Sequence, residues 1–170
     1  MSADSARWIR TGARDVEAHR DGVTADAAGA SPLMTALAKL LPDMGAATID
    51  RYWLAMTRET QIPTAPALGL LFVRDRLDMA QAIAAGRAWQ RLHLALTAAG
   101  YAAQPLNQPV ERVDRDQELG RGDDFARALA KFSEEPGWEA TFVFRLGVAE
   151  REAPPSPRRP LEAALRGAVL

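Results

Sequence analysis

The feature that most constrains the fold is an alanine-rich segment, residues 78–100, whose apolar side chains recur at helical spacing. Steps of three and four residues predict a single long helix with one stripe packed against a core. That stripe comprises Ala82, Ala85, Trp89, Leu92, Leu96 and Ala99. Small residues also occupy the opposite side, so this helix has no clean polar face. It is therefore expected at the centre of a larger core or at a dimer contact, where small residues let a second backbone approach.

Local signals set the ends of this helix and place strands around it. Asp78 is expected to cap its start, and Gly100 to end it. Two apolar runs, residues 68–73 and 140–146, predict buried strands. Because two or three strands do not form a stable open sheet alone, further strands are expected from the N-terminal segment or from a partner subunit.

The remaining segments predict further helices and two extended stretches. Helices are expected at residues 33–41, 46–60, 110–119 and 125–132, the last capped by Asp123 or Asp124, with a short closing helix from Leu161. Residues 1–31 are polar and are expected to be extended or partly disordered, and residues 153–160 carry four prolines and predict a stiff C-terminal arm. The chain, residues 1–170, is thus expected to form a single α+β domain, with helices packed on a small mixed sheet.

Composition excludes several functional classes. The 21 basic and 22 acidic side chains give a net charge of -1, which favours neither nucleic acid nor a membrane surface as a partner. There is no cysteine, so disulfides and thiolate chemistry are excluded. The two histidines, His19 and His93, have no second ligand three or four residues further along the chain, so no metal site is expected. Apolar runs are shorter than a membrane span, and a cytoplasmic location is expected.

Several of these pieces, taken in order, resemble a known family. They are the apolar run of residues 65–73, the helix sequence AGRAWQRLHLA at residues 85–95, the turn AGY at 99–101, the strand FVFRLG at 142–147 and RRPL at 158–161. In this order and spacing they resemble the C-terminal half of FMN-dependent nitroreductases. The resemblance implies a nitroreductase-like fold with the long helix at a dimer or pseudo-dimer interface. It also implies a homodimer that binds FMN and passes electrons from NAD(P)H to nitro or quinone-type acceptors.

The resemblance points to two places for the cofactor. The first is the segment after the long helix, with Gln104, Pro105, Leu106 and Asn107, which the family places beside the flavin ring. A polar group there would stabilise negative charge on the reduced flavin. The second is the pair Arg158 and Arg159, which match the family's contact with the FMN phosphate. The alternatives are a solvent-exposed connection for the first and a basic tail for the second. No catalytic acid, base or nucleophile is assigned, since in this family the flavin carries the chemistry.

The N-terminal part departs from the family's pattern. The family's "RRS-x-R" phosphate cluster and "APS-x-x-N" segment are not found, because Arg7, Arg10 and Arg14 have different spacing and the AGASP run at residues 28–32 is not followed by a matching asparagine. The chain is therefore expected to correspond to the second half of the family's domain, with a missing N-terminal half or a second subunit completing the site. Two alternatives stay open, a flavin-sequestering protein and a cofactor-free regulatory or interaction half-domain.

Overall fold

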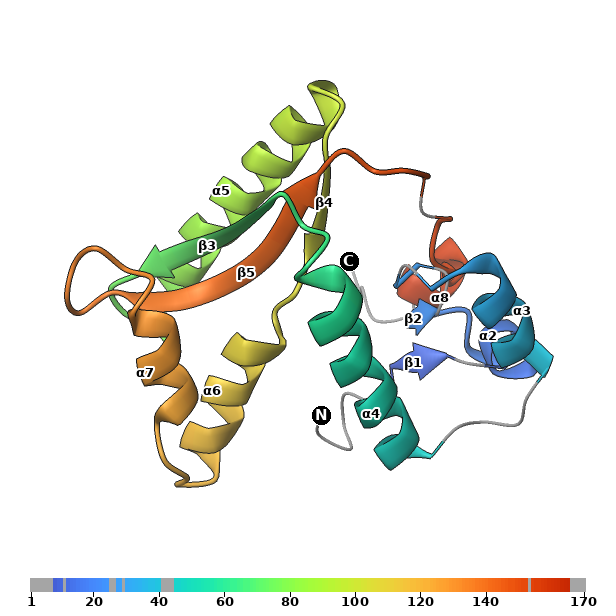
Figure 1. Cartoon of the computed structure of the whole chain (residues 1–170), viewed down its shortest axis with the longest axis horizontal. Helices are drawn as coiled ribbons and strands as arrows, with labels where there is room; N and C mark the ends of the chain where they lie inside the picture. Colours follow the sequence, from blue (N-terminus) through green and yellow to red (C-terminus); the bar gives the residue numbers. More distant parts are fainter. Residues whose placement is uncertain are drawn as a thin grey trace. The chain divides into compact units, whose positions relative to one another are not determined.

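The structure, a computed structural model, describes residues 8–10, 12–24, 27–28, 30–40, 45–152 and 154–165. The chain divides into two compact units (Figure 1). Unit 1 combines the segments Met1–Ala55 and Arg151–Leu170, and unit 2 is the continuous segment Met56–Glu150. Each unit is built from its own elements.

Unit 2 is organised around a three-stranded sheet in the order β3-β5-β4. Its elements are β3 (Ala67–Val73), α5 (Met79–Ala98), β4 (Ala102–Pro105), α6 (Gln108–Glu118), α7 (Asp124–Ala130) and β5 (Glu139–Gly147). β5 pairs antiparallel with both neighbours, so β3 and β4 run in the same direction with β5 between them. Strands that run in the same direction need a long crossover, and α5 supplies it. The predicted mixed sheet is thus antiparallel in both of its pairings.

The predicted long helix is α5, which covers one face of this sheet (Figure 1). Trp89 lies with its ring centroid 4.6 Å from that of Phe142 and 4.7 Å from that of Phe144, two side chains on the same face of β5. The predicted stripe is half-buried from Ala82 to Leu96, and Ala99 is exposed. The expectation that the apolar stripe of this helix packs on a core is therefore confirmed for all but its last residue.

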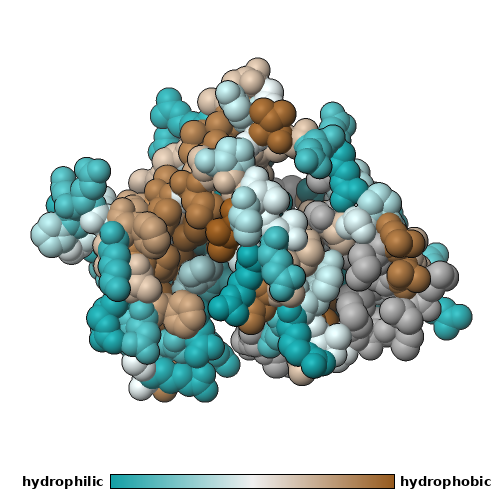
Figure 2. Space-filling model, in the orientation of Figure 1, coloured by the Kyte–Doolittle hydropathy of each residue, from teal (hydrophilic) through white to brown (hydrophobic). Residues whose placement is uncertain are grey.

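The other face of the sheet packs against α6 and α7 (Figure 1). Alternation along β5 turns Val143 away from α5, because successive strand residues point to opposite faces. The buried cluster on this side comprises Leu106, Val110, Leu129, Ala140 and Val143, with Leu70, Phe72 and Val113 packed against it. Helices thus pack on both faces of the sheet of unit 2. They do not cover it completely, because Figure 2 shows apolar side chains at the surface over β3 and β5, and Leu68 of β3 is 47% exposed.

The helix ends in unit 2 follow the local signals in part. The Asp78 side chain accepts hydrogen bonds from the backbone N–H groups of Ala80 and Gln81, and Gly100 adopts a φ of 80° just after α5, so both predicted ends are confirmed. Asp123 precedes α7, but its side chain caps no backbone N–H and instead binds Arg127. Asp123 therefore holds the predicted N-cap position of α7, but its side chain pairs with Arg127 and makes no capping hydrogen bond.

Unit 1 contains short elements. They are β1 (Ile9–Arg10), α2 (Ala13–His19), β2 (Val23–Thr24), α3 (Pro32–Leu40), α4 (Ala46–Met56) and α8 (Leu161–Leu165). The polar N-terminal segment, expected to be extended or partly disordered, contains the helix α2, and β1 pairs in parallel with β2. α3 begins at Pro32, one residue before the start of the predicted helix, and residues 154–160 form no regular element.

Helices and small sheets together give the α+β class. None of the helices in the described ranges combines the length and apolar composition that crossing a bilayer requires.

Candidate functional site

Gln104 and Pro105, expected in a connecting loop, form the end of strand β4. Gln104 pairs in register with Arg145 and Pro105 with Phe144, so the third strand of this sheet comes from residues 102–105 and not, as expected, from the N-terminal segment. β4 is an edge strand, and an edge strand tolerates a proline because its lost N–H can face away from the ladder. The segment is thus held rigidly against β5.

Leu106 and Asn107 continue the contact with β5 beyond the strand. The backbone N–H of Leu106 donates to the carbonyl oxygen of Val143 at 2.9 Å, and the Asn107 Oδ1 accepts from the Val143 N–H at 3.1 Å. Leu106 is also part of the buried core. Both predicted site residues therefore have a structural role, and their contact with a flavin stays a prediction.

Arg145 is a candidate site residue that the sequence patterns do not single out. Its Nε donates to Gln104 Oε1 at 2.8 Å, and its Nη1 donates to the carbonyl oxygen of Gln61 at 3.0 Å and to Thr64 Oγ1 at 3.3 Å. None of these described partners is a carboxylate. Burial lowers the pKa of the Arg145 guanidinium, although an arginine keeps its charge at neutral pH. Unit 2 thus holds a half-buried cation whose described partners are all neutral.

Gln61 is available to Arg145 because of how its helix ends. Thr57–Gln61 is a π-helical turn, η1, in which the N–H of Ile62 donates to the carbonyl oxygen of Thr57. The last carbonyls of a helix lack intrahelical partners, and a cation placed there is favourable. The Gln61 side chain is 1% exposed; its Oε1 accepts from Thr57 Oγ1, and its buried Nε2 has no hydrogen-bond partner among the described residues. π-Helical turns recur at functional sites, which makes this junction a candidate site.

A sequence signal for Arg145 existed. It is the single charged residue within the apolar run FVFRLG, and a charge in a strand that packs on both faces needs a specific partner. That partner lies 84 residues earlier in the chain, which no local pattern identifies.

The two predicted phosphate contacts, Arg158 and Arg159, lie in unit 1. Arg159 forms an ion pair with Asp21, which also accepts hydrogen bonds from Arg10 Nε at 3.1 Å and Nη2 at 2.7 Å. Hydrogen bonds from Arg10, and to a smaller extent from Arg159, hold the pKa of the Asp21 carboxyl below its ordinary value. The Arg159 guanidinium is thus already paired with a carboxylate.

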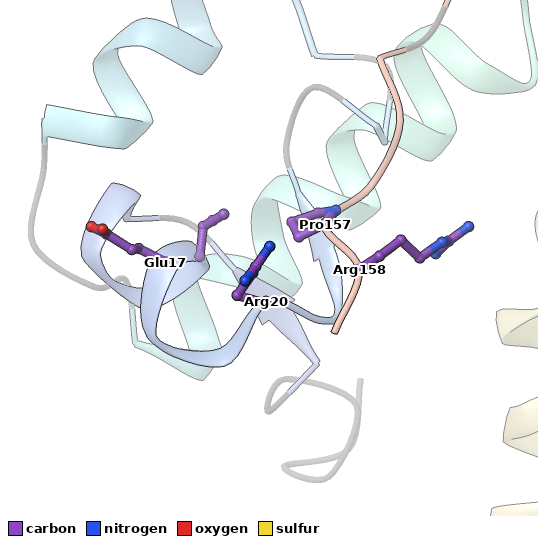
Figure 3. A pocket seen from close by; sticks show the side chains of 5 residues that line it. Glu17, Arg20, Pro157 and Arg158 are labelled. Atoms are coloured by element: carbon purple, nitrogen blue, oxygen red, sulfur yellow. The ribbon is translucent and has the colours of Figure 1, made fainter. Parts of the chain in front are cut away.

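Arg158 lines a cavity of about 420 Å³ with Val16, Glu17, Arg20 and Pro157. Figure 3 shows that its side chain extends away from Arg20, while Glu17 points in the opposite direction. A phosphate is held by donors that converge on it, and these charged groups diverge. The expected phosphate contact of Arg158 therefore stays a prediction. What favours it in unit 1 is that two cationic residues, Arg20 and Arg158, line the same cavity.

No family model, curated protein or solved structure matches the chain. Within the described part of the chain, no group of three or more histidine, aspartate and glutamate side chains is placed to hold a metal ion.

In unit 2, the Nη2 atom of the Arg145 guanidinium forms no hydrogen bond with a described residue. A half-buried cation with unused donors favours an anion or a ring that carries negative charge.

Proposed function

We propose that this chain is a nitroreductase-like flavoprotein, which binds FMN and uses NAD(P)H to reduce nitro or quinone-type acceptors. The observation that carries the proposal is the Arg145 guanidinium, which is half-buried, has only neutral described partners and is bonded to Gln104. Gln104 is also the first residue of the segment for which the nitroreductase resemblance implies flavin contact. Gln104 and Arg145 are thus the pair of side chains that would lie beside the flavin.

The residues present suit an electron-accepting ring. When bound, FMN would supply the redox chemistry of hydride and electron transfer. Arg145 would donate from Nη2 to the ring and stabilise its negative charge, because a fixed cation in a partly dehydrated site acts more strongly than one in water. Gln104 and the Gln61 carbonyl orient the guanidinium from two sides. The antiparallel pairing of β4 with β5 keeps Gln104 in register with Arg145.

We also propose that the protein is a homodimer in which α5 of each subunit forms the contact. Met79, Ile83 and Leu94 are exposed on α5, and at about 100° per residue they fall within about 60° of one another. Ala80, Gly86 and Ala98 lie beside them on the helix surface and permit close approach of a second helix, although Arg87 and Gln90 lie on the same side. The opposite side of α5 is occupied by the sheet, so the exposed stripe is the side available to a second copy.

The visible absorption spectrum of the purified protein tests the flavin proposal. The protein is loaded with FMN, desalted and compared with an unloaded sample. Retained flavin bands that bleach with NADH or NADPH are the expected result. Retained bands that bleach with dithionite and not with either nicotinamide would indicate a flavin-sequestering protein instead. A colourless protein after loading and desalting would overturn FMN binding by this chain alone.

A further inference from the structure

A second cavity lies in unit 2, among α6, α7 and the start of β5, and has no residue in common with the proposed flavin site. Its volume is about 470 Å³, within the range of small-molecule sites. Leu129 and Ala140 of the buried core line it, with Val113 packed against them. Phe125 and Trp138 add two aromatic rings to this apolar wall. The wall therefore suits a ligand with an apolar, aromatic body.

Trp138 is held in place by residues outside the cavity wall. Its Nε1 donates to Glu135 Oε2 at 2.7 Å, and the Arg74 guanidinium lies over its ring, 4.4 Å from the ring centroid. Arg74 also forms an ion pair with Glu135 at 3.2 Å and donates to the carbonyl oxygen of Pro136 at 3.1 Å. Because the indole N–H is already bonded, Trp138 offers a ligand apolar ring surface, and a ring fixed in advance loses little freedom on binding.

Phe125, the second ring, is 43% exposed although it belongs to the apolar wall. The Arg112 guanidinium lies 5.6 Å from its ring centroid, and Arg112 is itself bonded to Asp116 at 2.8 Å. A ligand that covers the Phe125 ring removes apolar surface from water, which is favourable in proportion to the area covered.

The charged side chains of the cavity wall, with one exception, already have described partners. The pairs are Asp116 with Arg112, Arg127 with Asp123, Arg76 with Asp114, and Glu139 with the backbone N–H of Arg76. The exception is Arg121, whose guanidinium forms no ion pair or hydrogen bond with a described residue. Arg121 is also exposed, so an anionic ligand can reach it. The cavity thus has one accessible charge to offer, and it is positive.

The end of α6 places Arg121 at this wall. Gly120 adopts a φ of 62°, and the N–H groups of Gly120 and Arg121 donate to the carbonyl oxygens of Gln117 at 3.1 Å and Asp116 at 2.7 Å. These two bonds form a Schellman cap, which fixes the backbone of the residue after the glycine. Arg121 therefore has an anchored backbone and a side chain whose N–H donors are unused.

We propose that this cavity binds a small aromatic carboxylic acid, with its ring system against Phe125 and Trp138 and its carboxylate bonded to Arg121. A guanidinium matches a carboxylate through two parallel hydrogen bonds, and such charge-assisted bonds are stronger than bonds to a neutral oxygen. The aromatic walls bind the body of the ligand, and Arg121 selects its charge. This site is independent of the proposed flavin site.

Titration calorimetry of the full-length protein with β-naphthoate and its neutral amide, β-naphthamide, tests the proposal. The two molecules share one ring system and differ in charge. β-Naphthoate is expected to bind about tenfold more tightly, because only its carboxylate forms charge-assisted bonds with Arg121. Equal or tighter binding of the amide would overturn the recognition of the carboxylate. Absence of binding by both molecules at millimolar concentration would overturn the site.

Two variants locate the site. Arg121→Gln is expected to lower the affinity for β-naphthoate to that for the amide and to leave the affinity for the amide unchanged. Ala126→Phe fills the cavity from α7 and is expected to abolish binding of both molecules without removing a polar group. An unchanged circular dichroism spectrum verifies that each variant is folded. Binding of β-naphthoate that survives either substitution at full strength would place the ligand elsewhere and overturn the assignment.

The matched control removes the same charge on the other side of the sheet. Arg91 is exposed on α5, and Arg91→Gln is expected to bind β-naphthoate like the wild type. An equal loss of affinity in Arg91→Gln and Arg121→Gln would show that net charge determines the affinity, which contradicts the proposed contact.

Discussion

Gly69 on β3 lies directly beneath the aromatic ring of Phe144 on the neighbouring strand. The two residues are paired in register, and a Cβ atom built on Gly69 would lie 2.2 Å from Phe144 Cζ. Phe144 in turn packs against Trp89 of α5. Because Gly69 has no side chain, the Phe144 ring can lie over β3 while it contacts Trp89 of α5.

Replacing Gly69 with alanine is expected to destabilise the protein by about 1–3 kcal/mol, because the Phe144 ring must leave its position and such overpacking has costs of this size. The midpoint of urea unfolding measures the change. Gly86→Ala is the matched control: it lies on α5 with no atom within 4 Å of an added Cβ, and it is expected to stabilise by about 0.5–1 kcal/mol. A neutral effect of Gly69→Ala would show that the ring moves freely.

The Asp78 cap predicts a pH dependence of stability. Hydrogen bonds from the Gln81 side chain, and then from the backbone N–H groups of Ala80 and Gln81, lower the pKa of the Asp78 carboxyl below its ordinary value of 3.8. The unfolded chain therefore binds a proton more readily than the folded one. The stabilisation is fully present above pH 3.8 and is lost as the pH falls through the lower, native pKa.

Asp78→Asn separates charge from capping, because asparagine is also a good cap. The wild type is expected to have the higher melting temperature at pH 7, and the difference is expected to shrink as the pH falls below 3.8. Thermal unfolding followed by circular dichroism at a series of pH values measures it. A difference that is constant down to pH 2 would contradict the role of the carboxylate.

Substitution of Arg145 tests the proposed flavin site. Arg145→Gln is expected to weaken FMN binding roughly tenfold to hundredfold, since a hydrogen bond to a charged group contributes about 1.5–3 kcal/mol. Arg145→Lys retains the charge and loses the forked donors, so an intermediate affinity is expected. Fluorescence quenching of FMN measures the dissociation constants.

The matched control removes the same charge elsewhere in unit 2. Arg115→Gln on α6 breaks an ion pair with Glu118 and is expected to leave FMN affinity unchanged. If both substitutions weaken binding equally, net charge and not the Arg145 cluster determines the affinity.

The proposed dimer is tested by one substitution on the exposed stripe of α5. Ile83 is 57% exposed, and Ile83→Arg places a charge where a second helix would pack. Sedimentation at micromolar concentration is expected to give a dimer for the wild type and a monomer for this variant. Leu119→Arg, at an exposed apolar residue after α6, is expected to remain dimeric. A monomeric wild type would contradict the dimer.

Part of the candidate site was predictable and part was not. The nitroreductase resemblance singled out Gln104, and the structure bonds this residue to Arg145. A proline after a helix is consistent with an exposed connection, but this segment forms a strand because β5 supplies a ladder of partners for its backbone. Arg145 and Gln61 escaped prediction because their meeting depends on the packing of distant segments.

The sequence by itself determined the elements whose causes are local. The apolar run of β3 and the spacing of α5, with its aspartate cap and terminal glycine, act within a few residues, so pattern and backbone preference suffice to identify them. Only the tertiary structure decided that β5 lies between β3 and β4, that Phe144 covers Gly69, and that Arg145 binds the end of η1. These contacts join residues far apart in the chain, and their free energy arises only when the whole sheet and its helices pack together.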